Sequence, residues 1–117
     1  MHYLLMLRFP EGAGPQEGTP EFDAEMARWG AINEEMRSAG AAVAGSGLQP
    51  EATTTVRAKD GDVTLTDGPF AETKEVLFSF YIIDVEDLDA ATAWAAKMPA
   101  AEYGSVEVRP MIHYETA

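Results

Sequence analysis

Two stretches of this chain are apolar almost without interruption, and they constrain its fold more than any other feature. The first runs from Tyr3 to Phe9 and the second from Val76 to Val85. A strand with one covered face alternates apolar with polar residues, whereas a strand covered on both faces reads as a continuous apolar run. We therefore expect two strands that are covered on both faces, and we interpret the second as the central strand of a sheet.

The spacing of apolar residues predicts a first helix from Pro20 to about Ala39. Thr19 can cap its beginning, proline is favoured at the first helical position, and Gly40 suits the left-handed stop. Gly30 weakens the middle of this helix by about 1 kcal/mol relative to alanine, which predicts a close approach of another backbone. The apolar stripe comprises Phe22, Met26, Trp29, Ile32 and Met36.

Four further strands and a second helix complete the pattern. Asp60-Gly61 is a strong signal for a two-residue hairpin turn between two of these strands. In the last strand Val106 and Val108 face one way, and the charged residues between and after them face the other. The elements are strands at 41–48, 53–59, 62–66 and 105–111 and a helix that begins after Asp87 and ends before Pro99.

This order predicts an α+β fold of the ferredoxin-like split βαβ type with an inserted β-hairpin, and residues 1–117 are long enough for a single domain. Two helices can cover only one face of such a sheet. The other face would expose apolar residues of the two continuously apolar strands, which is typical of an interface. We therefore expect a homodimer through the open face of the sheet. The residues expected on that face are Leu4, Met6, Phe78 and Phe80.

Composition excludes several classes of function. With 20 acidic and 8 basic residues the formal net charge is −12, which would repel nucleic acid. The chain has no cysteine, so disulfides and thiolate metal sites are excluded and a cytoplasmic location is predicted. The apolar start is short and has no basic n-region, so we interpret it as a strand, and no segment has the length of a membrane span. We expect binding neither to nucleic acid nor to membranes.

The residues between Asp67 and Glu75 form the most unusual turn of the chain. Gly68 can adopt a positive φ, and Pro69 fixes its own φ and lacks an N–H, so the preceding strand has to end here. The short carboxylate of Asp67 can accept backbone N–H groups of the same turn. Phe70 is an apolar side chain in a loop, which suggests an anchor. We interpret this group of four residues, 67–70, as a structural signature loop.

The stretch Asp67-Gly68-Pro69-Phe70-Ala71-Glu72-Thr73-Lys74-Glu75 resembles the signature of the DGPF-domain proteins, a branch of the YCII-related family in the dimeric α+β barrel superfamily. The similarity extends over nearly the whole chain, through the segments Tyr3–Leu7, Gly45–Pro50, Ala93–Ala95 and Gly104–Pro110. The resemblance implies two sheets that pair into a dimeric α+β barrel. This agrees with the open sheet face predicted above.

Charged residues around the signature loop are the candidate ligand site. A lysine among carboxylates at the mouth of a pocket suits a small anionic ligand or general acid–base chemistry. The alternative is that these charges form a solvated surface, as they commonly do in turns. We favour the structural role for Asp67 and keep ligand contact as the hypothesis for Lys74 and Glu75. The candidate ligand-binding residues are Trp29, Asp67, Lys74, Glu75 and Arg109.

The resemblance also implies a catalytic pair proposed for YCII-related enzymes, a histidine in the first helix and an aspartate just after the second. The matching positions lie at or near Trp29 and Met98, which lack this chemistry, so the pair is not carried over and the catalytic residues stay unknown. His2 and His113 stand near the two ends, and the carboxylates show no recognised ligand spacing. We predict neither a metal nor a cofactor.

Two classes of function remain. The first is a small-molecule-binding module or minor enzyme, whose pocket is bounded by the signature loop, the first helix and the barrel. The second is a regulatory protein that acts through protein contacts. The family resemblance supports a link to extracytoplasmic-function sigma factors for this second class, because genes of the family often lie near those of such factors. The identity of a substrate is not encoded in any motif of the sequence.

Overall fold

The computed structural model describes residues 1–68 and 74–113, which fold into an α+β structure. The strands are β1 (His2–Phe9), β2 (Ala42–Gly47), β3 (Thr54–Lys59), β4 (Asp62–Asp67), β5 (Val76–Asp84) and β6 (Ser105–Pro110). The helices are α1 (Pro20–Ser38), α2 (Leu88–Lys97) and α3 (Ala100–Tyr103), with a 3-10 turn, η1, at Pro50–Ala52. The predicted strands and helices are confirmed, with ends that differ by about one residue. The short α3 was not predicted, because four residues cannot show a helical period.

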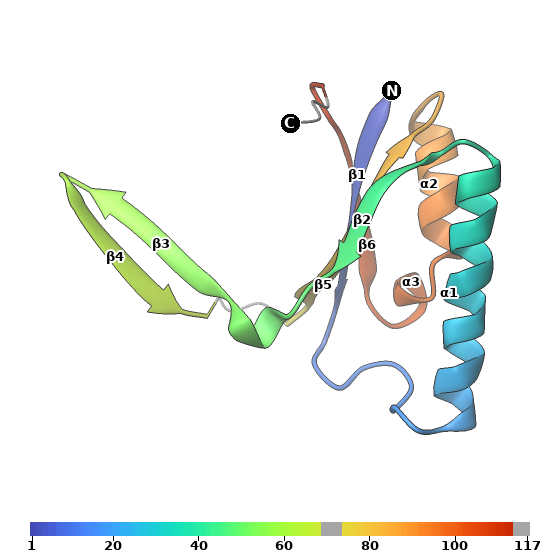
Figure 1. Ribbon diagram of the computed structural model, residues 1–117, viewed down its shortest axis with the longest axis horizontal. Coiled ribbons are helices and arrows are strands. Elements are labelled where there is room, and N and C mark those ends of the chain that lie inside the picture. Colours follow the sequence, from blue (N-terminus) through green and yellow to red (C-terminus); the bar gives the residue numbers. More distant parts are fainter. Residues whose placement is uncertain (69–73, 114–117) are drawn as a thin grey trace.

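The main sheet has the strand order β2-β5-β1-β6, and every neighbouring pair is antiparallel. The two apolar runs, β1 and β5, therefore lie in the middle, and this position was predicted for β5. Helices α1 and α2 each connect two strands that have another strand between them, which is consistent with a ferredoxin-like α+β fold. The helices lie on one face of the sheet (Figure 1).

The hydrophobic core lies between this sheet and the helices. Along β1 the side chains alternate, so that Tyr3, Leu5 and Leu7 are buried and the residues between them are only partly buried. Burying a large aliphatic side chain contributes about 1.5–3 kcal/mol relative to leaving it exposed. The layer between sheet and helices therefore provides most of the hydrophobic stabilisation. Its other members are Ile32, Met36, Ile83, Ala91, Met98 and Ala100.

Both long helices begin at the predicted capping residues. Thr19 Oγ1 accepts the N–H of Phe22 at 3.2 Å, and Asp87 Oδ1 accepts the N–H of Ala90 at 2.9 Å. Gly40, just after α1, has a φ of +72°. These bonds satisfy N–H groups that have no partner within the helix, so local sequence is sufficient to set the helix boundaries.

The prediction for Gly30 is wrong. Nothing lies within 4 Å of the position that a Cβ on Gly30 would take. Met26, one turn earlier, is 43% exposed although it belongs to the predicted apolar stripe. Only the second half of α1 buries side chains, at Ile32 and Met36. The first turns of the helix therefore place no demand on the size of residue 30.

A close approach of two backbones occurs instead at Gly104, which joins α3 to β6. A Cβ at this position would lie 2.1 Å from the carbonyl oxygen of Arg8 and 2.6 Å from the Cβ of Phe9. The chain can pass β1 here only because residue 104 has no side chain. The ring of Phe9 is held beside this point, stacked on Phe78 at 3.9 Å and edge-on to Tyr103 at 5.3 Å between ring centroids.

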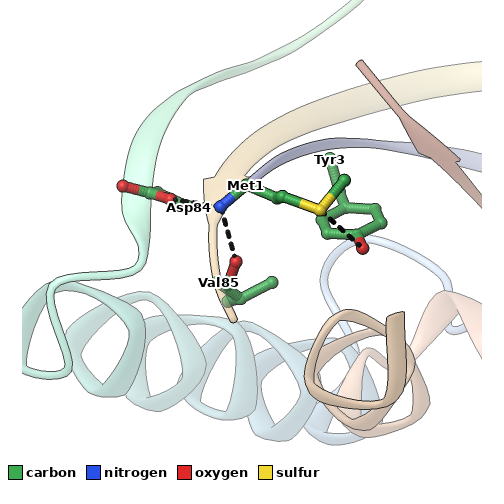
Figure 2. A network of polar contacts seen from close by, with 4 residues as sticks. All are labelled: Met1, Tyr3, Asp84 and Val85. Carbon is green, nitrogen blue, oxygen red and sulfur yellow. Dashed lines mark hydrogen bonds and ion pairs between the residues drawn. The ribbon is translucent and has the colours of Figure 1, made fainter. Parts of the chain in front are cut away.

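Met1 extends the pairing of β1 with β5 by one more set of contacts (Figure 2). The N-terminal ammonium donates to the carbonyl of Val85 at 2.8 Å and lies 3.2 Å from Asp84 Oδ1. The N–H of Val85 in turn donates to the carbonyl of Met1 at 2.9 Å. The Tyr3 hydroxyl lies 3.8 Å from the Met1 sulfur. This end of the sheet is opposite to the end at which β5 follows the signature loop.

The face of the sheet away from the helices is the open face. It carries two apolar cross-strand pairs, Leu4 with Ile82 and Met6 with Phe80, and all four side chains are only partly buried. Phe78 was expected here too, but it falls at a shift in the register and stacks on Phe9 instead. No helix within residues 1–68 and 74–113 covers this face (Figure 1).

The predicted hairpin is confirmed, and it forms a second sheet of its own. Strands β3 and β4 project away from the main sheet on the side opposite to the helices (Figure 1). The turn residues Asp60 and Gly61 have φ values of +51° and +83°, as the predicted two-residue turn requires. None of residues 54–67 is buried. We call residues 54–67 the arm, and the rest of the described chain the body.

Candidate functional site

The signature loop begins at the base of the arm. Gly68 has a φ of +98°, which fits the positive value expected there. Its N–H donates to the carbonyl of Thr53 at 2.8 Å, and its carbonyl accepts the Thr55 hydroxyl at 2.6 Å. The Asp67 side chain is exposed. Pro69 and Phe70 lie outside the described residues, as do the loop N–H groups of residues 70–73, so the structural role of Asp67 stays a prediction.

Glu75 and Lys74 lie where the loop enters β5. Glu75 Oε1 accepts the hydroxyl of Ser105 at 2.7 Å, which joins the end of the loop to the first residue of β6. Lys74 is exposed. Glu75 is thus fixed at the sheet, while Lys74 is accessible to solvent, and their roles in ligand binding stay predictions.

Glu107 lies between two arginines on the open face. Its carboxylate is 3.5 Å from Arg8 Nε and 3.0 Å from Arg109 Nη2. The Nε–H of Arg8 is buried and donates no hydrogen bond within the described part of the chain. Arg109 was among the residues predicted from the sequence and Arg8 was not, although Arg8 is a lone charge inside an otherwise apolar strand. A buried donor of this kind favours the approach of a further acceptor.

Trp29 lies on the opposite side of the sheet from this group. Its ring stacks on Tyr81 of β5, with 6.3 Å between the ring centroids and 12° between the planes. Tyr81 shares a face with buried Leu5, its partner in the register, whereas Arg109 pairs with Leu4 on the open face. The structure therefore does not bring Trp29 together with Arg109, and the predicted residues divide into two groups.

A cavity of about 400 Å³ lies between α1 and β2, next to Tyr81. The Tyr81 hydroxyl donates to Asn33 Oδ1 at 3.0 Å, which leaves the Asn33 amide nitrogen as a donor for a ligand. Burial raises the pKa of the Tyr81 phenol, and the hydrogen bond to Asn33 opposes this shift. The lining residues are Asn33, Met36, Arg37, Ala42, Val43, Ala44, Gly45, Ser46, Ser79 and Tyr81.

Gly45 shapes the wall of this cavity. A Cβ on Gly45 would lie 3.0 Å from Cδ1 of Tyr81 and 3.0 Å from the carbonyl oxygen of Phe80. The ring of Tyr81 therefore rests against the backbone of β2 at this glycine. Asn33, Arg37 and Tyr81 were not predicted as site residues, because they come together only through the packing of α1 on β2 and β5. The glycine in β2 was the local signal.

A second titratable group joins α1 to α3, away from the cavity. The Tyr103 hydroxyl donates to Glu25 Oε2 at 3.0 Å, and Arg28 forms an ion pair with Glu102. Burial and the bond to the Glu25 carboxylate raise the pKa of Tyr103 to about 12. The same arginine lowers the pKa of Glu102. These contacts attach α3 to the helix layer.

Metal sites and membrane-spanning helices were also considered within the described residues. Within residues 1–68 and 74–113, no three His, Cys, Asp or Glu side chains gather in a way that could hold a metal ion. No helix in these ranges is both long enough and apolar enough to cross a bilayer. The two candidate sites are therefore the cavity beside Tyr81 and the charged group on the open face.

Comparison with known families places this geometry in context. A family model described as the YCII-related domain matches residues 1–115. The chain belongs to the YCII-related family. The similarity seen in the sequence is thus confirmed at the level of this family.

A curated relative carries no functional description. The chain is 46% identical over 66 residues to an uncharacterized protein of Rhizobium meliloti (strain 1021). The match covers 55% of this chain and 53% of the relative, so it spans about half the length of each. Family membership therefore supports the fold, and any activity has to be argued from the site.

Proposed function

We propose that this protein is a small-molecule-binding module that takes a small organic acid, and that it acts as a cytoplasmic homodimer. The cavity between α1 and β2 is the observation that carries the proposal, because Arg37 lines it beside the Tyr81–Asn33 pair. Its volume of about 400 Å³ lies within the range of small-molecule pockets. The absence of cysteine supports a reducing compartment.

The lining residues indicate the chemistry of the ligand. Met36, Val43 and neighbouring alanines offer an apolar wall, whereas Arg37 is the charged residue among those that line the cavity. Its guanidinium pairs with Glu34 at the surface, an arrangement worth about 0–1 kcal/mol, so a ligand carboxylate can replace Glu34. Although the chain is acidic as a whole, salt screens distant charges beyond about 8 Å. A carboxylate with a short apolar body fits best.

Substitution of Arg37 tests this proposal. A panel of small carboxylic acids is screened by thermal shift, and affinities for the best binder are measured by calorimetry. Arg37→Gln should weaken binding by about tenfold or more, because a charge-assisted hydrogen bond is lost. Arg28→Gln is the matched control, since Arg28 lies on the same helix, pairs with Glu102 and does not line the cavity. A panel without a binder, or unchanged affinity in Arg37→Gln, would contradict the proposal.

The signature loop is an alternative binding site for the same class of ligand. If the loop binds the ligand, Lys74→Ala should leave the melting temperature unchanged and abolish binding, because Lys74 is exposed. If the cavity binds it, Lys74→Ala should bind like the wild type. The hypothesis of a binding site at the loop also includes Glu75 and Arg109. Glu75 accepts the hydroxyl of Ser105, and Arg109 lies on the same face of β6 as Ser105.

The homodimer of the α+β barrel type is supported by the uncovered apolar pairs of the open face. Met6→Asp would bury an unpaired carboxylate between two sheets and should cost several kcal/mol of dimer stability, roughly as expected for a desolvated charge. Sedimentation equilibrium at micromolar concentration measures this. A wild-type protein that stays monomeric under these conditions would contradict the dimer.

The regulatory alternative, with its link to extracytoplasmic-function sigma factors, stays a prediction from family resemblance. It is distinguished from ligand binding by co-purification of a sigma factor with the tagged protein. Given the net charge of −12, such a role would use protein contacts and no DNA contact.

A further inference from the structure

The arm has one apolar face and one polar face. Residues that pair across an antiparallel ladder share a face, and here Val56 pairs with Leu65 and Ala58 pairs with Val63. The neighbouring pairs, Thr55 with Thr66 and Arg57 with Thr64, point to the other face. The arm therefore carries an aliphatic stripe on one side only.

This stripe is exposed to solvent in the single chain. Val56 is 60% exposed, Val63 is 65% exposed and Leu65 is 69% exposed. A hairpin of two strands alone is at best marginally stable in water, because it has no third element against which to bury a face. A stripe of this kind is typical of a surface that another molecule covers.

The open face of the main sheet lies on the same side of the molecule as the arm. The helices cover the other face, and the arm leaves the sheet on the side away from them (Figure 1). The open face carries its own apolar pairs, Leu4 with Ile82 and Met6 with Phe80. One molecule that docks on this side would meet both surfaces.

We propose that the arm is a clasp that packs its apolar stripe against a second copy of this chain, which docks on the open sheet face. In a two-fold dimer each copy offers one open face and one arm, so a single contact covers all four surfaces. Six paired residues span about 20 Å, and four strands about 4.8 Å apart make a sheet about 15–20 Å wide. The arm is thus long enough to reach across a partner. This inference rests on the proposed homodimer.

Cysteine labelling tests the clasp without disturbing the fold. Because the chain has no cysteine, a single introduced thiol is the only reactive one. Val63→Cys lies on the apolar stripe, and Thr64→Cys, the next residue, lies on the polar face. Above the dimer dissociation constant, Val63→Cys should react with a maleimide about tenfold more slowly than Thr64→Cys, and dilution to the monomer should remove the difference. Equal rates at all concentrations would overturn the clasp.

Charge substitution gives an independent measurement. Leu65→Asp should weaken dimerisation by about 100-fold in sedimentation, because a carboxylate on the stripe would be desolvated. Thr64→Asp, on the polar face, should change it by less than about threefold. Met6→Asp separates the two proposals: if it dissociates the dimer while Leu65→Asp has no effect, the homodimer holds and the clasp is wrong. A wild-type monomer at micromolar concentration would overturn both.

Discussion

Strands β4 and β6 show how the same sequence pattern can have two different environments. Each has six residues, and each alternates apolar with polar side chains. In β6, Val106 and Val108 pack against the core, whereas in β4 Val63 and Leu65 are exposed. Alternation thus predicts a strand with one apolar face, but it does not predict what covers that face.

The contrast extends to the body and the arm as a whole. In the body, helices cover one face of the main sheet, and the backbone contact at Gly104 leaves no room for a side chain (Figure 1). The arm is attached through η1 and the turn at Gly68, and it buries no residue of its own. We therefore expect large effects from substitutions in the body and small, local effects in the arm of the isolated chain.

The strongest test of this contrast compares two glycines. Gly104→Ala would place a Cβ 2.1 Å from the Arg8 carbonyl oxygen, so β1 and β6 would have to separate, at a cost of about 3 kcal/mol or more. Gly61→Ala, at a φ of +83° in the arm, should cost about 1 kcal/mol and affect the arm alone. Urea denaturation gives the first value, and hydrogen exchange locates the second. Equal losses at the two sites would remove the contrast.

Asp67 lies where the arm meets the body, so its effect should be intermediate. If its carboxylate accepts N–H groups of the signature loop, Asp67→Ala leaves these donors unsatisfied and should cost about 1–3 kcal/mol. Lys74→Ala is the control, because removal of an exposed lysine should cost about 0–1 kcal/mol. Thermal melts of both variants measure the difference. An Asp67→Ala protein as stable as the wild type refutes the structural role of this residue.

Gly30 is a position in the body at which an added side chain would meet no neighbour. No atom lies within 4 Å of the position of its missing Cβ, and the residue is in the middle of α1. Gly30→Ala should therefore stabilise the protein by about 1 kcal/mol through helix propensity alone. A rise in the urea midpoint at an unchanged m value would show this. A loss of stability would mean that a neighbour approaches this turn, for example in the dimer.

Substitution of Tyr103 should have the smallest effect on stability, and this effect should be measurable only at high pH. Its pKa is about 12 in the folded chain and roughly 10 in an unfolded chain, so the folded state holds the phenolic proton more strongly. This contribution to the free energy of unfolding is complete below about pH 10 and is lost as the pH rises towards 12. Since Tyr103 is partly exposed, the effect is modest. Stability should fall more steeply between pH 10 and 12 in the wild type than in Tyr103→Phe, and equal slopes would contradict the shift.

The sequence by itself determined the six strands and the two long helices, with boundaries within about one residue of those observed. The caps at Thr19 and Asp87, the stop at Gly40 and the turn at Asp60-Gly61 depend on bonds and φ angles within a few residues, so the local sequence is sufficient. The uncovered face of the sheet was predictable as well, because two helices cannot cover both faces of strands that are apolar throughout.

Only the tertiary structure decided which distant residues meet. It placed Trp29 and Arg109 on opposite faces of one sheet, and it assembled a cavity from Asn33, Arg37 and Tyr81, which belong to two separate elements. The close backbone contact expected at Gly30 is absent there, and one occurs at Gly104 instead. These outcomes depend on strand register and on how α1 and α3 pack against the sheet. No local sequence pattern predicts these contacts, because each of them forms between residues that are far apart in the chain.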